Sequence, residues 1–259
     1  MIRTITYLGV LFILLPIAAI LASSVTELRY ISFPPKGFTL DWYFDAIKRR
    51  EFLSSFQISI LIACLAAFAS TVLGTLTSLA LRILPLKWRS LALSVVLSPL
   101  VLPGVVIGIS LLQFFTLARL GISTTTLIIG HVVITVPYVV RLISDSLSTL
   151  PRNLEWASAS LGCSPIETLF KVTLPCIKAG VMGGALFAFI VSFENVTISV
   201  FLAAPQLTTL PVRIFGYTDQ AIETWLVAIC SIAVVFTVLL IWIIERAFGL
   251  ERVFYAGKT

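Results

Sequence analysis

Six apolar runs, each of 20 residues or more, constrain the fold of this chain more than any other feature. The runs lie near 5–24, 57–81, 91–117, 122–143, 179–203 and 222–244. A helix of about 20 residues crosses the roughly 30 Å of hydrocarbon in a bilayer. The runs are too long for barrel strands and lack their in–out alternation, so helices are the form that satisfies the backbone in lipid. The sequence therefore predicts an all-α membrane protein with six transmembrane helices in a single transmembrane domain, 1–259.

The composition agrees with this class, because only 12% of the residues are charged and 59% are hydrophobic. A soluble domain carries about 25% charged residues. The first run could instead be a cleaved signal peptide, since Arg3 precedes it and Ala19, Ala22 and Ser23 offer small residues near its end. That run is longer than a usual signal-peptide core, and five more runs follow, so we expect a retained helix.

The distribution of lysine and arginine predicts the orientation in the membrane. With both termini on one side, that side carries eleven of these residues and the opposite side seven. The eleven are Arg3, Arg82, Lys87, Arg89, Arg141, Arg152, Lys171, Lys178, Arg246, Arg252 and Lys258. The positive-inside rule then places both termini and the loop 144–178 in the cytoplasm of a bacterial inner membrane. This bias and anionic lipid head groups account for the net charge of +6, and nucleic-acid binding is not expected.

The exported segment 25–56 contains an aromatic cluster within 39–45 that includes Trp42 and Tyr43. Such a pattern is typical of a short amphipathic helix at the membrane interface. It could be an anchor without a partner, or it could contact an external binding protein.

Two positions inside the apolar runs carry groups that are costly in lipid. His131 is the only histidine, and a satisfied hydrogen bond between helices explains it better than a proton relay, which usually needs several titratable groups. Glu194 lies near mid-depth of the fifth run, where a carboxylate costs about 2.5–3.5 kcal/mol. We therefore expect Glu194, with Phe193 and Asn195 beside it, to line a translocation path, or else to make a structural bond inside the bundle.

Glycine pairs with GxxxG spacing occur at Gly104/Gly108 and at Gly180/Gly184. Each pair alone is a weak signal, but both indicate close helix packing. The prolines Pro99 and Pro103 in the same run as Gly104 favour a broken helix.

The loop 144–178 is polar between two apolar runs, which indicates that something soluble docks on it. A short helix over 155–161 is expected, with Asn153 as its N-cap and Gly162 as its end. A second helical segment should begin after Ser164-Pro165 and stop at Leu174-Pro175. From the residues alone, docking on a partner and packing against the chain's own bundle remain equally open.

The chain contains no catalytic motif. Nucleotide-binding loops, metal-ligand spacings and hydrolase triads are all missing from the sequence, and the four cysteines have no CxxC spacing. No catalytic or metal residues and no bound cofactor are therefore expected, and the chain should not be an enzyme by itself.

The loop resembles the "EAA" loop of permease subunits in ATP-binding-cassette importers. The residues that carry the resemblance are Glu155, Trp156, Ala157, Ser158, Leu161, Gly162, Leu174 and Pro175. Counted back from Gly162, the family's glutamate position holds Trp156, and Glu155 lies one place earlier. The whole chain is similar to the second permease of spermidine/putrescine-type importers, through Gly37-Phe38-Thr39, Trp42-Tyr43, Gly74, Pro99, Pro137 and Ser192–Val196.

This resemblance implies a type I importer bundle with a cytoplasmic coupling helix at 155–161. It also implies four kinds of partner: a second, different six-span permease, two cytoplasmic ATPase subunits that bind ATP and magnesium, an exported solute-binding protein, and membrane lipid. The eight loop residues would couple to the ATPase, and a polyamine would be the solute.

Three alternatives remain open. The importer could carry another small solute, such as an opine, an amino acid or an oxyanion. An ion-coupled secondary transporter would need more intramembrane ion-binding groups than Glu194 and His131. A membrane scaffold that transports nothing would leave Glu194 and the loop without a purpose.

Overall fold

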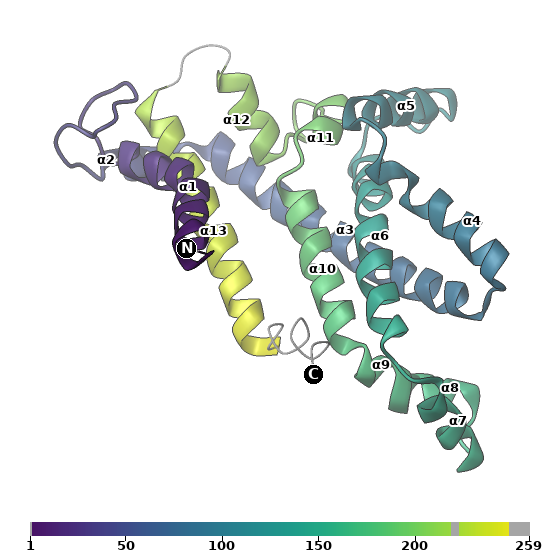
Figure 1. The fold of residues 1–259 in the computed structure, drawn as a ribbon. Helices are drawn as coiled ribbons and strands as arrows, with labels where there is room; N and C mark the ends of the chain where they lie inside the picture. The colour runs from purple at the N-terminus through teal and green to yellow at the C-terminus, as the bar shows by residue number, and fades with distance from the viewer. Residues whose placement is uncertain (1, 219–222, 249–259) are drawn as a thin grey trace. The chain divides into compact units, whose positions relative to one another are not determined.

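The computed structural model describes residues 2–218 and 223–248. Within these residues, all the regular secondary structure elements are helices (Figure 1). The predicted all-α class is confirmed. The chain divides into two compact units. The first contains the residues up to Ile58 and Thr208–Ile241, and the second contains Ser59–Leu207 with the described residues from Trp242 onward. Arg252 and Lys258, which entered the orientation argument, lie outside the described residues, as does the first residue of the predicted run 222–244.

The first unit is built from α1 (Ile2–Ser23), α2 (Asp41–Lys48), the start of α3 (Arg50–Ile83), α12 (Leu210–Thr218) and most of α13 (Thr224–Phe248). No residue in the most apolar window of α1 is buried, as expected for a helix that faces lipid. The helix α2 occupies the place predicted for an interfacial helix. Its aromatic residues bind their own chain: Trp42 donates to the Thr26 carbonyl at 2.7 Å, and the Tyr43 hydroxyl lies 2.6 Å from that of Ser24.

The second unit holds the rest of α3 and the run of helices from α4 to α11. Their bounds are α4 Leu86–Leu97, η1 Ser98–Leu100, α5 Gly104–Leu117, α6 Thr124–Ser148, α7 Arg152–Ser160, α8 Pro165–Thr168, η2 Leu169–Thr173, α9 Leu174–Cys176, α10 Lys178–Phe193 and α11 Thr197–Phe201. In Figure 1, α6 and α10 lie side by side, α7 and α8 lie beyond one end of this pair, and α5 and α11 lie at the other end.

The two glycine pairs lie where helices approach most closely. A side chain at Gly180 would meet Ser146 and the Leu142 carbonyl of α6, and one at Gly184 would meet Val139. Gly104 and Gly108 face Thr197 and Phe201 of α11 in the same way. The close packing predicted from the GxxxG spacing is therefore present: a Cβ at Gly180 or Gly108 would clash, and one at Gly184 or Gly104 would be in tight contact.

The core of the second unit runs along this α6–α10 contact. Its buried side chains come from α3, α6, the segment that joins α6 to α7, the segment that joins α9 to α10, and α10 itself. They are Ala67, Val139, Ile143, Leu147, Leu150, Ile177 and Ala188.

Several predicted runs differ from the helices that form. Among the described helices, four are long and apolar enough to cross a membrane unbroken, and up to six spans result if each of two bent pairs counts as one. The run predicted at 91–117 is broken at residues 101–103, where α4 with η1 meets α5 at 97°. Pro103 is the N-cap of α5, and Pro99 lies in η1; neither has an N–H to continue a helix. The run at 179–203 likewise stops at Phe193 and resumes as α11.

Candidate functional site

The short helix α7 forms the centre of the polar loop and lies in the second unit. It begins at Arg152, with Pro151 as its N-cap residue and no capping side chain, so the predicted Asn153 cap is wrong. A proline that precedes the first turn fixes the backbone there without a side-chain cap. The helix ends as predicted: Gly162 has φ +88°, a conformation that glycine adopts without steric cost.

Glu155 binds two other segments of its own chain. Its Oε2 lies 3.2 Å from Nη2 of Arg82, at the end of α3, and its Oε1 accepts a hydrogen bond from Thr173 in η2 at 2.9 Å. The two charged side chains are only 13% and 27% exposed, so water screens this pair less than a surface pair. Glu155 therefore fixes α7 to α3 and to η2.

A second bond fixes α7 to the helix that follows it. The buried hydroxyl of Ser158 lies 3.0 Å from that of Thr168 in α8. The Ser164–Glu167 capping box confirms the predicted start of α8 at Ser164-Pro165. The bond from the Ser164 backbone N–H, together with the one from Lys171, lowers the pKa of Glu167 below its ordinary value.

The predicted stop at Leu174-Pro175 is wrong. The chain stays helical through the π-helix η2 and through α9, and the direction changes only at Ile177, where the path bends by 69° into α10. Pro175 has no N–H and its ring would collide with the carbonyl of Lys171 in a regular α-helix. The wider π turn directly before it accommodates the ring without ending the helix.

Large apolar side chains project from this element into solvent. Trp156 is 67% exposed, Leu161 85%, Ile166 69% and Phe170 63%. Beside them lies a cleft of about 510 Å³, lined in part by Arg82, Glu155, Trp156 and Ala159. We refer to Trp156, Leu161, Ile166 and Phe170 together as the coupling face, after the role that the sequence predicts for this loop.

Of the other predicted loop residues, Ala157 is exposed on α7, Leu174 is half-buried and packs against the core of the unit, and Pro175 is exposed. The structure thus brings the eight predicted coupling residues onto one continuous element, α7 to α9. The sequence did not predict that Arg82 and Thr173, which bind Glu155, belong to this site. Nothing in the sequence pairs an arginine at the end of an apolar run with a glutamate in a distant loop.

The predicted path residues lie at the opposite end of α10, where α10 breaks before α11 (Figure 1). Phe193 is 3% exposed and stacks on Phe189, with ring centroids 5.8 Å apart. Asn195 accepts a bond from the backbone N–H of Ile198 at 2.7 Å, close to the start of α11, whose N-cap residue is Val196. Glu194 alone of the three is exposed, and it makes no ion pair with residues 2–218 or 223–248. Its carboxylate therefore lies at a helix break with no ion-pair partner among the described residues.

His131 is fully buried and joins three helices of the same unit. Its Nδ1 lies 2.7 Å from the hydroxyl of Ser192 in α10, and its Nε2 lies 3.0 Å from that of Ser199 in α11. Both ring nitrogens are therefore satisfied by neutral partners. This is the helix-to-helix bond predicted for it.

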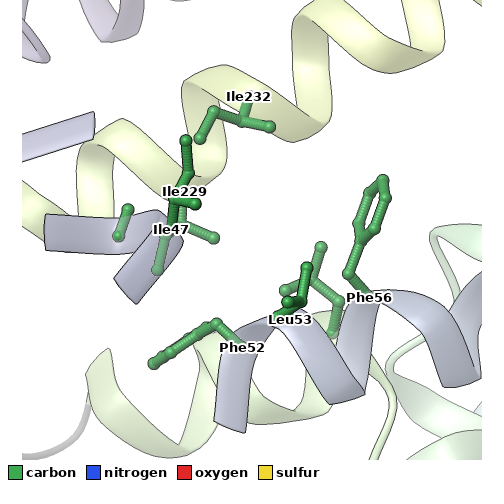
Figure 2. Close-up of a pocket in the computed structure, with 8 residues that line it drawn as sticks. Ile47, Phe52, Leu53, Phe56, Ile229 and Ile232 are labelled. Carbon is green, nitrogen blue, oxygen red and sulfur yellow. The ribbon is translucent and has the colours of Figure 1, made fainter. Parts of the chain in front are cut away.

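An apolar cavity of about 150 Å³ lies within the first unit (Figure 2). Phe52, Leu53 and Phe56 reach into it from α3, Ile47 from α2, and Ile229 and Ile232 from α13. The lining contains no charged side chain, so this cavity offers nothing to balance a charged solute.

Comparison with known proteins places these features in context. A family model described as "Binding-protein-dependent transport system inner membrane component" matches residues 70–249. The putrescine transport system permease protein PotI of Escherichia coli K12 is 28% identical over 232 residues, which cover 87% of this chain and 82% of that protein. PhnV of Salmonella typhi, a permease protein named for 2-aminoethylphosphonate transport, is 29% identical over 241 residues, 92% of this chain and 91% of that protein.

A solved structure has the same fold. A chain in the crystal structure of a bacterial ABC transporter involved in import of the acidic polysaccharide alginate superimposes with a TM-score of 0.76. The match covers 95% of each chain at 16% sequence identity, so it bears on the fold alone. The predicted importer-permease fold is thereby confirmed.

Proposed function

The chain belongs to the family of binding-protein-dependent transport system inner membrane components, and we propose that it forms half of the path of an ATP-binding-cassette importer for a polyamine. It is a multi-pass inner-membrane transport subunit. The partners proposed for this chain are a second, different permease, two cytoplasmic ATPase subunits that hold ATP and magnesium, and an extracytoplasmic solute-binding protein. The lysine and arginine bias supports an orientation with both termini in the cytoplasm.

The coupling face is the observation that carries this proposal. Its four large apolar side chains project from an element at one end of α6 and α10, and such a face is typical of a docking site on a soluble protein. Trp156 is the expected anchor, because tryptophan is enriched among residues that contribute most to binding energy. The ATPase would receive this face in a groove.

The contacts of Glu155 and Ser158 supply the mechanical link. A force on α7 reaches α3 through Arg82, and reaches η2 and α8 through Thr173 and Thr168. From η2 it passes across the bend at Ile177 into α10, which ends about 24 Å further along at Glu194. Movement of α7 on ATP binding would thus shift the far end of α10, as rigid elements with two discrete packings do.

The relatives and Glu194 together support a polyamine as solute. Putrescine and 2-aminoethylphosphonate, for which PotI and PhnV are named, both carry a primary ammonium group. A free carboxylate at a helix break is a suitable partner for such a group. One carboxylate cannot balance a polycation, so the second permease would contribute further acidic groups. An aminophosphonate is the second candidate, since PhnV is as similar to this chain as PotI.

The test uses the intact importer, purified through a tag on this chain and reconstituted in liposomes. We expect ATP-dependent uptake of labelled putrescine, with weaker competition by 2-aminoethylphosphonate. Glu194→Gln should raise the KM for putrescine by roughly tenfold, the loss of about one charge-assisted bond. Asp145→Asn, an exposed carboxylate at the other end of the unit, should leave the KM unchanged.

Three results would contradict the proposal. Uptake without any ATPase, driven by an ion gradient, would make this a secondary transporter. Preference for 2-aminoethylphosphonate over putrescine would show that the solute is an aminophosphonate. Equal KM values for Glu194→Gln and Asp145→Asn would show that Glu194 does not contact the solute.

A further inference from the structure

A cavity of about 240 Å³ lies in the second unit, where the ends of α3, α4, α6 and α7 meet. Three arginines line it: Arg82 from α3, Arg89 from α4 and Arg152 from α7. Hydroxyl groups of Ser78, Ser144 and Ser148 line the same space. The volume is large enough for a tetrahedral anion and several waters, given about 30 Å³ for one water in the liquid.

The arginines in this cavity carry more positive charge than the chain around them balances. Arg82 is the only one of the three with a carboxylate partner among residues 2–218 and 223–248, and that partner, Glu155, faces the neighbouring cleft. No acidic residue lines the cavity itself. Arg152 donates from Nη2 to the backbone carbonyl of Arg82 at 3.1 Å, which positions its guanidinium without neutralising it.

One nitrogen of Arg82 is also unsatisfied. Its Nη2 donates to the Leu150 carbonyl at 3.1 Å and lies beside Glu155, but its Nη1 is buried without a hydrogen-bond partner in the described part of the chain. Buried polar groups are nearly always bonded, and an unbonded charged donor is costly. Arg82 therefore keeps a donor that an acceptor within its reach would satisfy, and its side chain lines this cavity.

We propose that the cavity binds the phosphate group of an anionic phospholipid. Guanidinium groups bind phosphate oxygens in pairs of parallel hydrogen bonds, and three of these groups line the cavity. Free phosphate has the same chemistry, but the position of the cavity favours a lipid. Arg82 lies in the last turn of the candidate span Arg50–Ile83, and basic side chains at the ends of spans are suited to contact lipid head groups.

The outer surface of α4 supports this choice of source. Trp88, next to Arg89 in the sequence, is 60% exposed, as tryptophans at a membrane–water boundary are. Further along the same helix, Trp88, Leu91 and Val95 line a wholly apolar groove that suits acyl chains. A lipid in the cavity would hold the Arg82 guanidinium, and through it the Arg82–Glu155 pair, whichever solute the importer carries.

The experiment measures lipid retention by the full chain purified in mild detergent. Native mass spectrometry counts bound phosphatidylglycerol against phosphatidylcholine in titrations of each lipid. Arg89→Gln should weaken phosphatidylglycerol binding about tenfold, since it removes a charge-assisted pair of bonds. Lys87→Gln is the matched control: it removes the same charge two residues away, from an exposed side chain that does not line the cavity. Thermal unfolding of both variants verifies that they fold equally well.

Unchanged phosphatidylglycerol binding by Arg89→Gln would overturn the proposal. Weaker phosphatidylglycerol binding in Arg89→Gln, with unchanged binding in Lys87→Gln, supports the proposal. Equal losses in the two variants would show general surface attraction and overturn it, and so would equal binding of phosphatidylcholine. If inorganic phosphate displaces the lipid completely when the two are at equal concentration, the site takes free phosphate and the lipid assignment is wrong.

Discussion

Arg82 and Glu155, which stand far apart in the sequence, form an ion pair of 3.2 Å between the end of α3 and the first turn of α7. In the loop motif that this chain resembles, the glutamate position is held by Trp156, and Glu155 precedes it by one residue. Adjacent residues on a helix point about 100° apart, so the two side chains project in different directions. Trp156 faces solvent while Glu155 faces the chain's own α3 and η2. Trp156 is thus exposed to the proposed ATPase partner, while Glu155 attaches α7 to its own chain.

Removal of either partner of this pair should destabilise the second unit. Glu155→Gln and Arg82→Gln should each lower the unfolding free energy by about 1–2 kcal/mol, with a coupling energy of about 1 kcal/mol between them, because the pair is half-buried. Thermal unfolding of the two single variants and the double variant measures this coupling. Lys171→Gln, in the exposed pair with Glu167, should have a much smaller effect. Purely additive losses would show that the pair contributes nothing.

Gly162→Ala should impair coupling through the backbone alone. The residue has φ +88° and no atom within 4 Å of an added methyl group, so the substitution costs about 1–2 kcal/mol of backbone strain without a clash. Relief of that strain would redirect Leu161 and the coupling face, and ATP-dependent uptake should fall several-fold. Gly121→Ala, with φ +63° and equal free space, is the control. Equal uptake in the two variants would contradict a role in coupling.

Ser158→Ala should loosen α7 from α8. The change leaves the buried Thr168 hydroxyl without its partner, at a cost of about 1–2 kcal/mol. Hydrogen exchange of the amides in 152–168 should accelerate. Ser160→Ala, whose hydroxyl is exposed and bonds only within its own helix, should change little. The prediction is wrong if both variants exchange at the wild-type rate.

Two glycines three residues apart in α10 should respond with opposite signs. Gly180→Ala drives a methyl group into Ser146 and the Leu142 carbonyl, and should cost about 1–3 kcal/mol. Gly183→Ala meets nothing within 4 Å and should gain up to about 1 kcal/mol from better helix propensity. Melting temperatures of the two variants in detergent measure these effects. A shift of the same sign in both variants would refute the packing assigned to α6 and α10.

The start of α8 should lose protection in acid. The Ser164 N–H and Lys171 lower the pKa of Glu167 in the folded state. The ionised Glu167 side chain therefore stabilises the start of α8 fully above its ordinary pKa near 4.5, and this stabilisation is lost as the pH falls through the lowered pKa. The glutamine of Glu167→Gln can still cap the helix but has no charge to titrate. The protection of the backbone N–H groups of 164–168 against exchange should therefore not change in this acidic pH range in this variant. Persistent pH dependence in this variant would assign the effect to another group.

Local signals were sufficient for much of the fold and part of the site. The lengths of the apolar runs predicted a helical membrane protein, Gly162 and Ser164-Pro165 predicted where α7 ends and α8 begins, and the GxxxG pairs predicted close contacts. Each of these depends on properties of a few neighbouring residues. The stop predicted at Pro175 failed because the π-helix before it depends on how the whole segment packs.

Backbone satisfaction in lipid and turn chemistry are local requirements, so the residue order alone was enough to predict membrane helices, short helices in the polar loop and the residues that lie there. The folded structure was needed to show that Glu155 is bound by Arg82 and Thr173, that Phe193 is buried while Glu194 is exposed, and that three arginines from three helices surround one cavity. Those relationships join segments distant in sequence, and they depend on helix rotation and break angles that no local pattern encodes.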